Sequence, residues 1–179
     1  MSRTSMDMTR GSLKKQILFF SIPLMLSNLL QVLFNMSDIA VIGQFAGAMS
    51  LGAVGSTTTL ISMYTGFLIG LSGGINVLTA LYIGARNRKS VSETVHSAFL
   101  VSLVVGLILL ILGVSTSRGV LVLLNTKEEL IDKAALYIRI YFLGIPALAL
   151  YNFGNAVFSA AGDTGRPLRY LFLSGIVNV

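Results

Sequence analysis

The stretch NLLQVLFNMSD, residues 28–38, decides the fold of this chain. In a helix, Asn28, Gln31, Asn35 and Asp38 share one face, because they are spaced three, four and three residues apart. Leucine, valine and methionine occupy most of the remaining positions. The stretch therefore predicts a helix with a polar stripe along an otherwise apolar surface.

The apolar segment around this stripe is long enough to cross a lipid bilayer. Residues 17–42 contain one ionisable side chain, Asp38, and exceed the roughly 20 residues that span a hydrocarbon core. A carboxylate at that depth costs about 2.5–3.5 kcal/mol on insertion scales. We therefore expect Asp38 to face a protein interior or a wet cavity rather than lipid, and to line a transport path.

The composition is that of an integral membrane protein. Hydrophobic residues make up 54 % of the chain and charged residues 11 %, and the mean hydropathy is +0.82. The absence of cysteine excludes disulfides and thiolate metal sites, and a single histidine argues against a zinc site. The net charge of +6 lies in short loops between apolar segments, so topology explains it better than nucleic-acid binding.

Further apolar segments predict an all-α, polytopic bundle of membrane-spanning helices. The predicted spans are residues 17–42, 53–83, 95–116, 136–160 and 168–179. The last holds 12 residues where a span needs roughly 20, so we expect a fifth helix that is truncated. Residues 1–15 are polar and basic and predict a cytoplasmic N-terminal tail, followed by the helical bundle over residues 16–179.

Proline and glycine mark special points in the first two spans. Pro23 removes one backbone hydrogen bond, which predicts a kink near residues 19–23, either a moving hinge or a static packing feature. In the second span, Gly66, Gly70 and Gly74 recur every four residues, a spacing that is typical of close helix packing.

The fourth predicted span carries a second polar face. Asn152, Asn155 and Ser159 are three and four residues apart and so lie on one side of a helix. Two amides on one face indicate either a lined cavity or hydrogen bonds between helices. Asn76, together with nearby serine and threonine residues of the second span, is expected to add polar lining.

The distribution of basic residues predicts the orientation of the chain in the membrane. With the N-terminus inside, nine of the 13 lysines and arginines fall on the cytoplasmic side. Arg118, Lys127, Lys133 and Arg139 remain on the opposite side. This bias favours a cytoplasmic N-terminus.

A lone carboxylate among amides suits transport rather than catalysis. It can exchange a proton, coordinate Na⁺ with neighbouring oxygens, or pair with a cationic substrate. An intramembrane aspartyl protease needs a second carboxylate, and no other acidic residue lies in a predicted span. The chain also lacks the Gly-Lys-Ser/Thr loop of ATP-driven transporters. We therefore expect a transporter and not an enzyme.

Several motifs resemble those of one transporter family. The run IPLMLSNLLQ at residues 22–31, with Asn35, Asp38 and the later GAVG at 52–55, is similar to the first span and following segment of multidrug and toxic compound extrusion (MATE) transporters. The segments GLSGG at 70–74, GAR at 84–86 and AAGDTGRP at 160–167 resemble the family's second span, first cytoplasmic loop and fourth-to-fifth-span loop.

The resemblance implies a twelve-helix antiporter of two six-helix lobes, of which this chain is most of the N-terminal lobe. Such a protein exports small amphiphilic or cationic substrates in exchange for Na⁺ or H⁺ and uses no other cofactor. It lies in the lipid of a prokaryotic inner membrane, and its partner is the missing C-terminal lobe. The resemblance assigns ion coupling to Asp38, with Na⁺ as one ligand, and to Asn178. The cavity lining would be Asn28, Gln31, Asn35, Asn152 and Asn155, and the hinge Pro23.

Two alternatives stay open at this point. A flippase of related architecture would move a lipid-linked or amphiphilic precursor, but it is expected to hold phosphate with basic residues inside the cavity. No basic residue lies in the core of a predicted span. A structural membrane subunit would use Asp38 only as a hydrogen-bonding group in helix packing.

Overall fold

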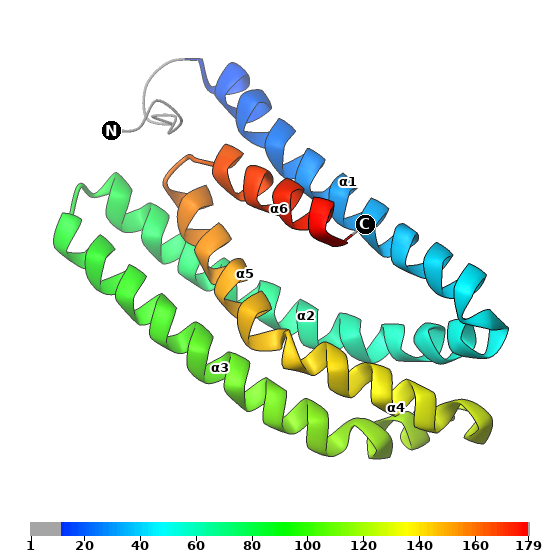
Figure 1. The fold of residues 1–179 in the computed structure, drawn as a ribbon. Helices are drawn as coiled ribbons and strands as arrows, with labels where there is room; N and C mark the ends of the chain where they lie inside the picture. Colours follow the sequence, from blue (N-terminus) through cyan, green and yellow to red (C-terminus); the bar gives the residue numbers. More distant parts are fainter. Residues whose placement is uncertain (1–11, 179) are drawn as a thin grey trace. The chain divides into compact units, whose positions relative to one another are not determined.

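The computed structural model describes the backbone of residues 12–178, with the side chains of residue 12 and of residues 14–177 (Figure 1). This part of the chain is helical throughout, apart from short turns, and contains no strand. The helices are α1 (Leu13–Phe45), α2 (Gly47–Gly84), α3 (Arg88–Leu123), α4 (Glu128–Leu143), α5 (Ile145–Ala160) and α6 (Gly165–Asn178). The predicted all-α fold class is confirmed.

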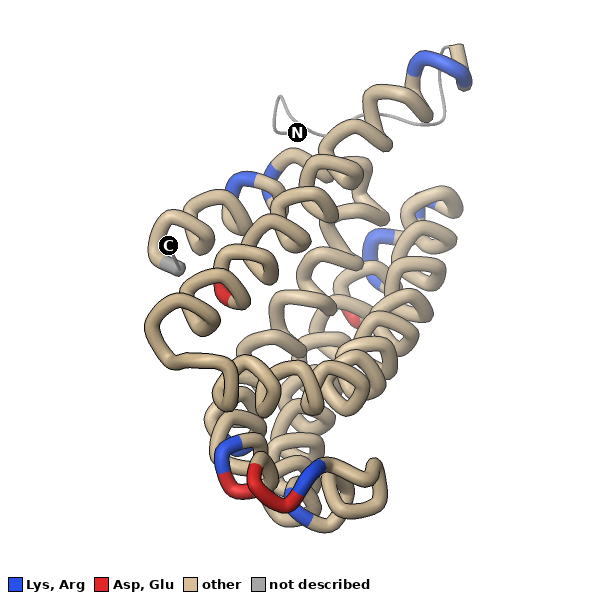
Figure 2. Tube along the Cα trace, turned by 90° about the vertical axis from the view of Figure 1, so that its right-hand side faces the viewer, with Lys and Arg blue, Asp and Glu red and all other residues tan. Residues whose placement is uncertain are grey.

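The long helices have the length and composition of membrane spans. Three of them qualify individually: α1 over Lys14–Phe45, α2 and α3. The helices α4 and α5 qualify only as a pair, which is bent by 48° and has the form of a broken span or a re-entrant loop. Charged residues lie mostly near helix ends, with long uncharged stretches between them (Figure 2). The chain is therefore an integral membrane protein.

The helices extend beyond the predicted spans. The segment between the first two predicted spans is almost entirely helical, since α1 ends at Phe45 and α2 begins at Gly47. Gly47 has a φ of +78°, which a glycine adopts at little cost and which turns the chain between the two helices. Nothing in the sequence on either side stops a helix, so α1 and α2 continue to this one turn.

A helix is interrupted beside Pro146, whereas the helix that contains Pro23 is continuous. Pro23 lies inside the continuous helix α1, where the Ser27 hydroxyl donates a hydrogen bond of 2.9 Å to the Pro23 carbonyl. The single fourth span predicted over residues 136–160 is instead two helices that meet at Gly144. Pro146 falls in the first turn of α5, where a missing N–H is tolerated. The fourth predicted span thus contains a bend of 48°, whereas the kink expected near residues 19–23 stays a prediction.

The chain divides into two compact units. The first combines the chain up to Ser37 with Ser72–Ala98 and the chain from Phe153 onward. The second combines Asp38–Leu71 with Phe99–Asn152. Residues of α1, α2, α3 and α5 therefore contribute to both units.

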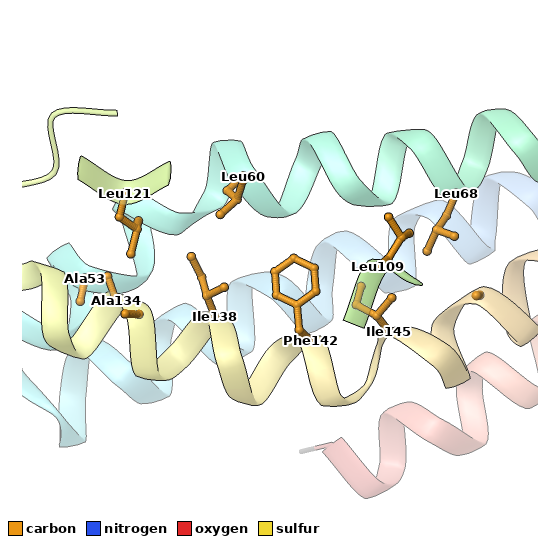
Figure 3. Close-up of a cluster of buried hydrophobic side chains, with 11 residues drawn as sticks. Ala53, Leu60, Leu68, Leu109, Leu121, Ala134, Ile138, Phe142 and Ile145 are labelled. Carbon is orange, nitrogen blue, oxygen red and sulfur yellow. The ribbon is translucent and has the colours of Figure 1, made fainter. Parts of the chain in front are cut away.

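The second unit holds a buried apolar cluster (Figure 3). Phe142 of α4 is fully buried at its centre, and its ring meets the Tyr64 ring of α2 edge-on at a centroid distance of 4.7 Å. Other members are Leu60 and Leu68 of α2, Leu109 and Leu121 of α3, and Ile138 and Ile145. In a bilayer such clusters are held by van der Waals packing, because lipid tails are as apolar as leucine.

Glycines of α3, and not the three glycines of α2 that the sequence favoured, allow helices to approach closely. A methyl group on Gly113 would overlap the Phe142 ring, and one on Gly106 would lie 2.8 Å from the Pro146 Cα. A methyl group on Gly66, Gly70 or Gly74 would have no described atom of another residue within 4 Å. The packing role predicted for those three glycines is therefore wrong within the described chain. Their spacing is correct for packing, but among the described residues no other helix lies within 4 Å of the methyl positions on this face of α2.

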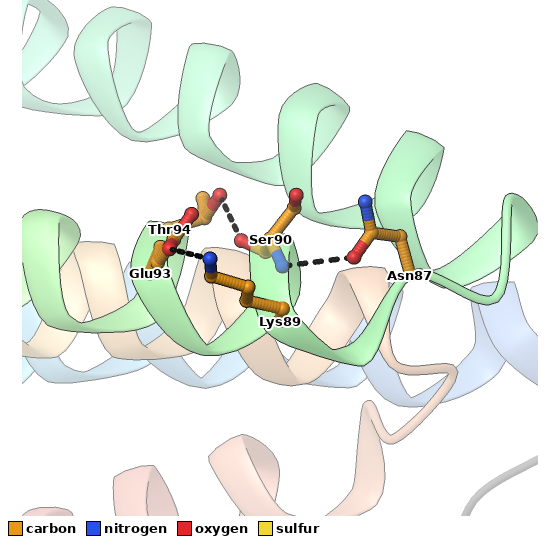
Figure 4. A network of polar contacts seen from close by, with 5 residues as sticks. All are labelled: Asn87, Lys89, Ser90, Glu93 and Thr94. Carbon is orange, nitrogen blue, oxygen red and sulfur yellow. Dashed lines mark hydrogen bonds and ion pairs between the residues drawn. The ribbon is translucent and has the colours of Figure 1, made fainter.

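The turn between α2 and α3 is fixed by a polar network (Figure 4). The Asn87 side chain accepts a hydrogen bond of 3.1 Å from the Ser90 N–H and so caps the start of α3. Lys89 and Glu93 form an ion pair of 3.9 Å one turn further on. Arg86 has a φ of +55°, an uncommon conformation for a residue with a side chain. This turn sets the end of α2 against the beginning of α3.

Candidate functional site

The polar stripe of α1 lies beside the face by which the helix packs. Asn28, Gln31, Asn35 and Asp38 are all exposed. The residues one position earlier, Ser27, Leu30, Phe34 and Ser37, are buried or half-buried. One residue corresponds to a rotation of about 100° around a helix. The stripe is therefore open and adjoins the packed face, as expected of residues that line a cavity.

Asp38 has an electrostatic partner on α4. Its carboxylate interacts electrostatically with the phenol of Tyr137, which is half-buried in the second unit. Tyr141 lies one helical turn further along α4 and interacts in turn with Tyr137. Neither tyrosine was among the site residues predicted from the sequence. The signal available was their spacing of four residues, which puts two phenols on one face of the fourth span.

Asp38 and Tyr137 together offer hard oxygen ligands to a small cation. The carboxylate supplies negative charge and the phenol a neutral oxygen, and oxygen is the ligand that hard cations prefer. The same pair can hold a proton, because a carboxylic acid donates a hydrogen bond once it is protonated. The site thus suits either of the two ions proposed from the sequence.

The amides of α5 form bonds within their own helix. The Asn152 amide donates a hydrogen bond of 2.9 Å to the Leu148 carbonyl, and Asn155 accepts one of 3.4 Å from the Ser159 hydroxyl. The alternative of hydrogen bonds between helices applies instead to Asn76 of α2, which donates to the Ala156 carbonyl of α5 at 2.8 Å. Asn76, expected only as polar lining, therefore links two helices.

The predicted site residues are distributed over both compact units. Asp38 and Asn152 belong to the second unit, together with Tyr137. Pro23, Asn28, Gln31, Asn35 and Asn155 belong to the first unit. Asn178 is the last residue of α6, and its side chain lies outside the described residues. The structure thus places Asp38 and Tyr137 in one unit, while the grouping of Asp38 with the amides stays a prediction.

A second polar stripe is buried inside the first unit. Ser72 and Thr79 of α2 are 7 % and 0 % exposed, and Asn76 lies between them on the same face. Among the described residues, the Thr79 hydroxyl is one of two buried polar side-chain groups without a hydrogen-bond partner. This face of α2 is therefore polar but closed, in contrast to the open stripe of α1.

Several helices long enough to span a bilayer define a polytopic membrane protein. The family comparison is more specific. The MatE family model matches residues 23–179, and the chain belongs to this family, that of the MATE transporters. The fold is that of the N-terminal lobe of these transporters.

Bacterial multidrug resistance proteins are among the similar sequences. Probable multidrug resistance protein YpnP of Bacillus subtilis is 35 % identical over 174 residues, covering 96 % of this chain and 39 % of that protein. Probable multidrug resistance protein NorM of Thermotoga maritima is 26 % identical over 167 residues, covering 93 % of this chain and 36 % of that protein. The chain therefore spans less than half the length of these relatives.

Solved structures of the family have the same fold. A crystal structure of MATE in the bent conformation superimposes with a TM-score of 0.87 at 25 % identity, covering 96 % of this chain and 39 % of that one. A MOP superfamily transporter from Pyrococcus furiosus also gives a TM-score of 0.87 at 25 % identity, covering 96 % of this chain and 38 % of that one.

Proposed function

We propose that this chain forms the N-terminal lobe of a secondary active antiporter that exports organic cations and other amphiphiles in exchange for Na⁺ or H⁺. The observation that carries the proposal is the position of Asp38. It is the one acidic residue inside the apolar segment of α1, it lies on an open polar stripe, and it interacts with the Tyr137 phenol. The names of the bacterial relatives as probable multidrug resistance proteins support the same activity.

The mechanism is a competition at Asp38. When the site opens outward, the carboxylate takes up H⁺ or Na⁺, which removes the negative charge that holds a cationic substrate. Asn28, Gln31 and Asn35 offer amide oxygens and donors along the same face of α1, and Asn152, Asn155 and Asn178 are proposed to contribute further amides. Release of the ion to the cytoplasm restores the carboxylate and the affinity for the next substrate. Each cycle thus exchanges one ligand for the other.

Pro23 is the proposed hinge of this cycle. A proline inside a membrane helix lacks one backbone hydrogen bond, so the turn before it bends at lower cost than the rest of the helix. The charge change at Asp38 lies on the same helix, 15 residues beyond Pro23. Ion binding would therefore act on α1 as a whole.

The proposal includes a location and a set of partners. The protein lies in the cell membrane of a prokaryote with its N-terminus in the cytoplasm, because the basic residues are concentrated on that side. Its partners are lipid, the transported molecule and a C-terminal lobe. The coupling ion is its only cofactor, and neither nucleic-acid binding nor enzymatic activity belongs to this function.

The decisive experiment measures efflux from proteoliposomes that contain the full-length protein. A fluorescent organic cation is loaded, a Na⁺ or H⁺ gradient is imposed, and wild type is compared with Asp38→Asn. We expect gradient-driven efflux to fall to background in Asp38→Asn, because the amide cannot take up a proton and lacks the negative charge that attracts Na⁺ and a cationic substrate. The gradient that drives the wild type identifies the ion.

Asp132→Asn is the matched control. Asp132 is an exposed carboxylate of α4 that pairs with Arg118 at 3.1 Å, and its loss is expected to leave efflux unchanged. Coupled efflux that survives in Asp38→Asn would overturn the assignment of the coupling site. Absence of efflux under either gradient in the wild type would instead favour the flippase.

A further inference from the structure

The loop between α5 and α6 is buried although it is polar. Asp163 and Thr164 are only 3 % and 5 % exposed. Asp163 is fully engaged near its own position: one carboxylate oxygen accepts the Arg166 N–H at 3.2 Å and the other pairs with the Arg166 guanidinium at 3.0 Å. These contacts fix the start of α6. They leave Thr164 as the polar residue of the loop that bonds to another helix.

Thr164 contacts the first part of α1. Its hydroxyl donates a hydrogen bond of 3.3 Å to the Phe20 carbonyl, although the two residues are 144 positions apart in the chain. Serine and threonine hydroxyls elsewhere in the described chain mostly donate to carbonyls of their own helix, as Thr94 does to Ser90 at 2.8 Å. The Thr164 bond is therefore a tertiary contact and not a feature of local helix geometry.

The bond is made in the helical turn that Pro23 weakens. Pro23 has no N–H to offer the carbonyl four residues earlier, that of Phe19, so this turn has lost one of its own hydrogen bonds. Thr164 adds a donor at Phe20, the next carbonyl in the same turn. A buried hydroxyl in a membrane protein is expected to keep such a bond, because leaving it unmade is costly.

Helix α6 holds α1 at a second point. The Phe34 ring packs onto Gly175 of α6 so closely that a methyl group on this glycine would overlap it. Phe20 and Phe34 are thus the two ends of a segment of α1 that is held by α6 and the loop before it, and Pro23, Asn28 and Gln31 lie between them. The segment that carries the proposed hinge is therefore fixed at both ends.

We propose that Thr164 is a positioning residue, whose hydrogen bond to the Phe20 carbonyl keeps the proline turn of α1 seated against the start of α6. The bond is released when α1 moves and re-forms when α1 returns. The importance of this movement for transport rests on the proposed function above. The hydrogen bond that holds α1 against the start of α6 does not depend on that function. The hydroxyl thereby sets the balance between two positions of α1.

The test measures access to α1 directly. The chain has no cysteine, so a single cysteine at position 27 reports on the packed face of α1, where Ser27 is 7 % exposed. Its rate of reaction with N-ethylmaleimide is measured in the full-length protein. We expect Thr164→Val, which keeps the shape and loses the donor, to raise this rate about three- to fivefold, and Thr164→Ser to restore it.

Two controls separate positioning from general loosening. Ala98→Cys reports on a buried position of α3 in the same unit, and its labelling rate should not change in Thr164→Val. Thr94→Val removes a hydroxyl that bonds only within α3, and it should leave labelling at position 27 unchanged. If Thr164→Val does not reach the membrane, Thr164→Ala makes the same comparison.

The proposal is overturned by an unchanged rate at position 27, by an equal rise at positions 27 and 98, or by a failure of Thr164→Ser to restore the rate. Because labelling requires no transport, its outcome is independent of Asp38→Asn. In a transporting protein, Thr164→Val is also expected to alter the maximal efflux rate more than the apparent affinity for substrate, since no contact with the substrate is removed.

Discussion

Tyr137 is the residue that adds most to the predicted environment of Asp38. A carboxylate on an exposed stripe of α1 has many possible environments, and that of Asp38 includes an electrostatic interaction with the Tyr137 phenol of α4. The coupling ion would then be held between two helices rather than on one. Binding of the ion is thereby connected to the relative position of α1 and α4, both within the second unit at this point.

The contribution of this phenol can be measured. Tyr137→Phe keeps the ring and removes the oxygen, so we expect the apparent affinity for the coupling ion to change about two- to tenfold, corresponding to a polar interaction of about 0.5–1.5 kcal/mol. The measurement is the ion dependence of efflux in proteoliposomes. Tyr170→Phe, in an exposed position on α6, is the control. An ion dependence identical to that of the wild type would exclude the phenol from the site.

At the scale of elements, α3 is the helix that shapes the broken fourth span. Gly113 receives the Phe142 ring just before the break at Gly144, and Gly106 lies against Pro146 just after it. The two glycines are seven residues apart and therefore lie on the same face of α3. The two helices that meet at the bend of 48° thus each pack against a glycine of α3, where no side chain stands in the way.

Adding one methyl group to α3 tests this match. Gly113→Ala forces the methyl group against the Phe142 ring, and we expect the protein to lose about 1–3 kcal/mol of stability. The measurement is thermal unfolding of the purified full-length protein in detergent. Gly119→Ala on the same helix meets no described atom within 4 Å, so it should be neutral or stabilising, because alanine favours helix over glycine. Equal effects of the two substitutions would contradict the proposed fit.

At the scale of the whole molecule, the apolar surface is exposed as a membrane protein requires. In the most apolar 18-residue stretch of α1 no residue is buried. In the corresponding stretch of α3 only 28 % of the residues are buried. In water such surfaces would drive aggregation. In a bilayer they are covered by lipid or by further protein, so their exposure carries no hydrophobic cost. The stability of the isolated chain in water is therefore not the relevant quantity for this protein.

The orientation of the molecule in the membrane can be tested with the cysteine-free sequence. Single cysteines are placed at exposed positions 88 and 127, beside the turns that follow α2 and α3. A membrane-impermeant maleimide added to intact cells should label position 127 and reach position 88 only after permeabilisation, because the cytoplasmic side carries the larger share of basic residues. The reverse pattern would place the N-terminus outside.

Periodicity along the chain predicted much of this protein. The long apolar segments, the polar stripe of α1 from Asn28 to Asp38, and the second polar face of Asn152 and Asn155 are all local patterns. A helix has a fixed 3.6-residue turn, so the sequence alone determines which residues share a face. The resemblance of several motifs to the MATE family, read from the same residues, is confirmed by the family match over residues 23–179.

The tertiary structure decided which of those faces meet. Sequence spacing favoured Gly66, Gly70 and Gly74 for close packing, whereas the rotation of α3 brings Gly106 and Gly113 into contact. The bonds from Asn76 to Ala156 and from Thr164 to Phe20 join residues 80 and 144 positions apart. Contacts between helices depend on the rotation, tilt and register of each helix, and these are set by packing that no local pattern encodes.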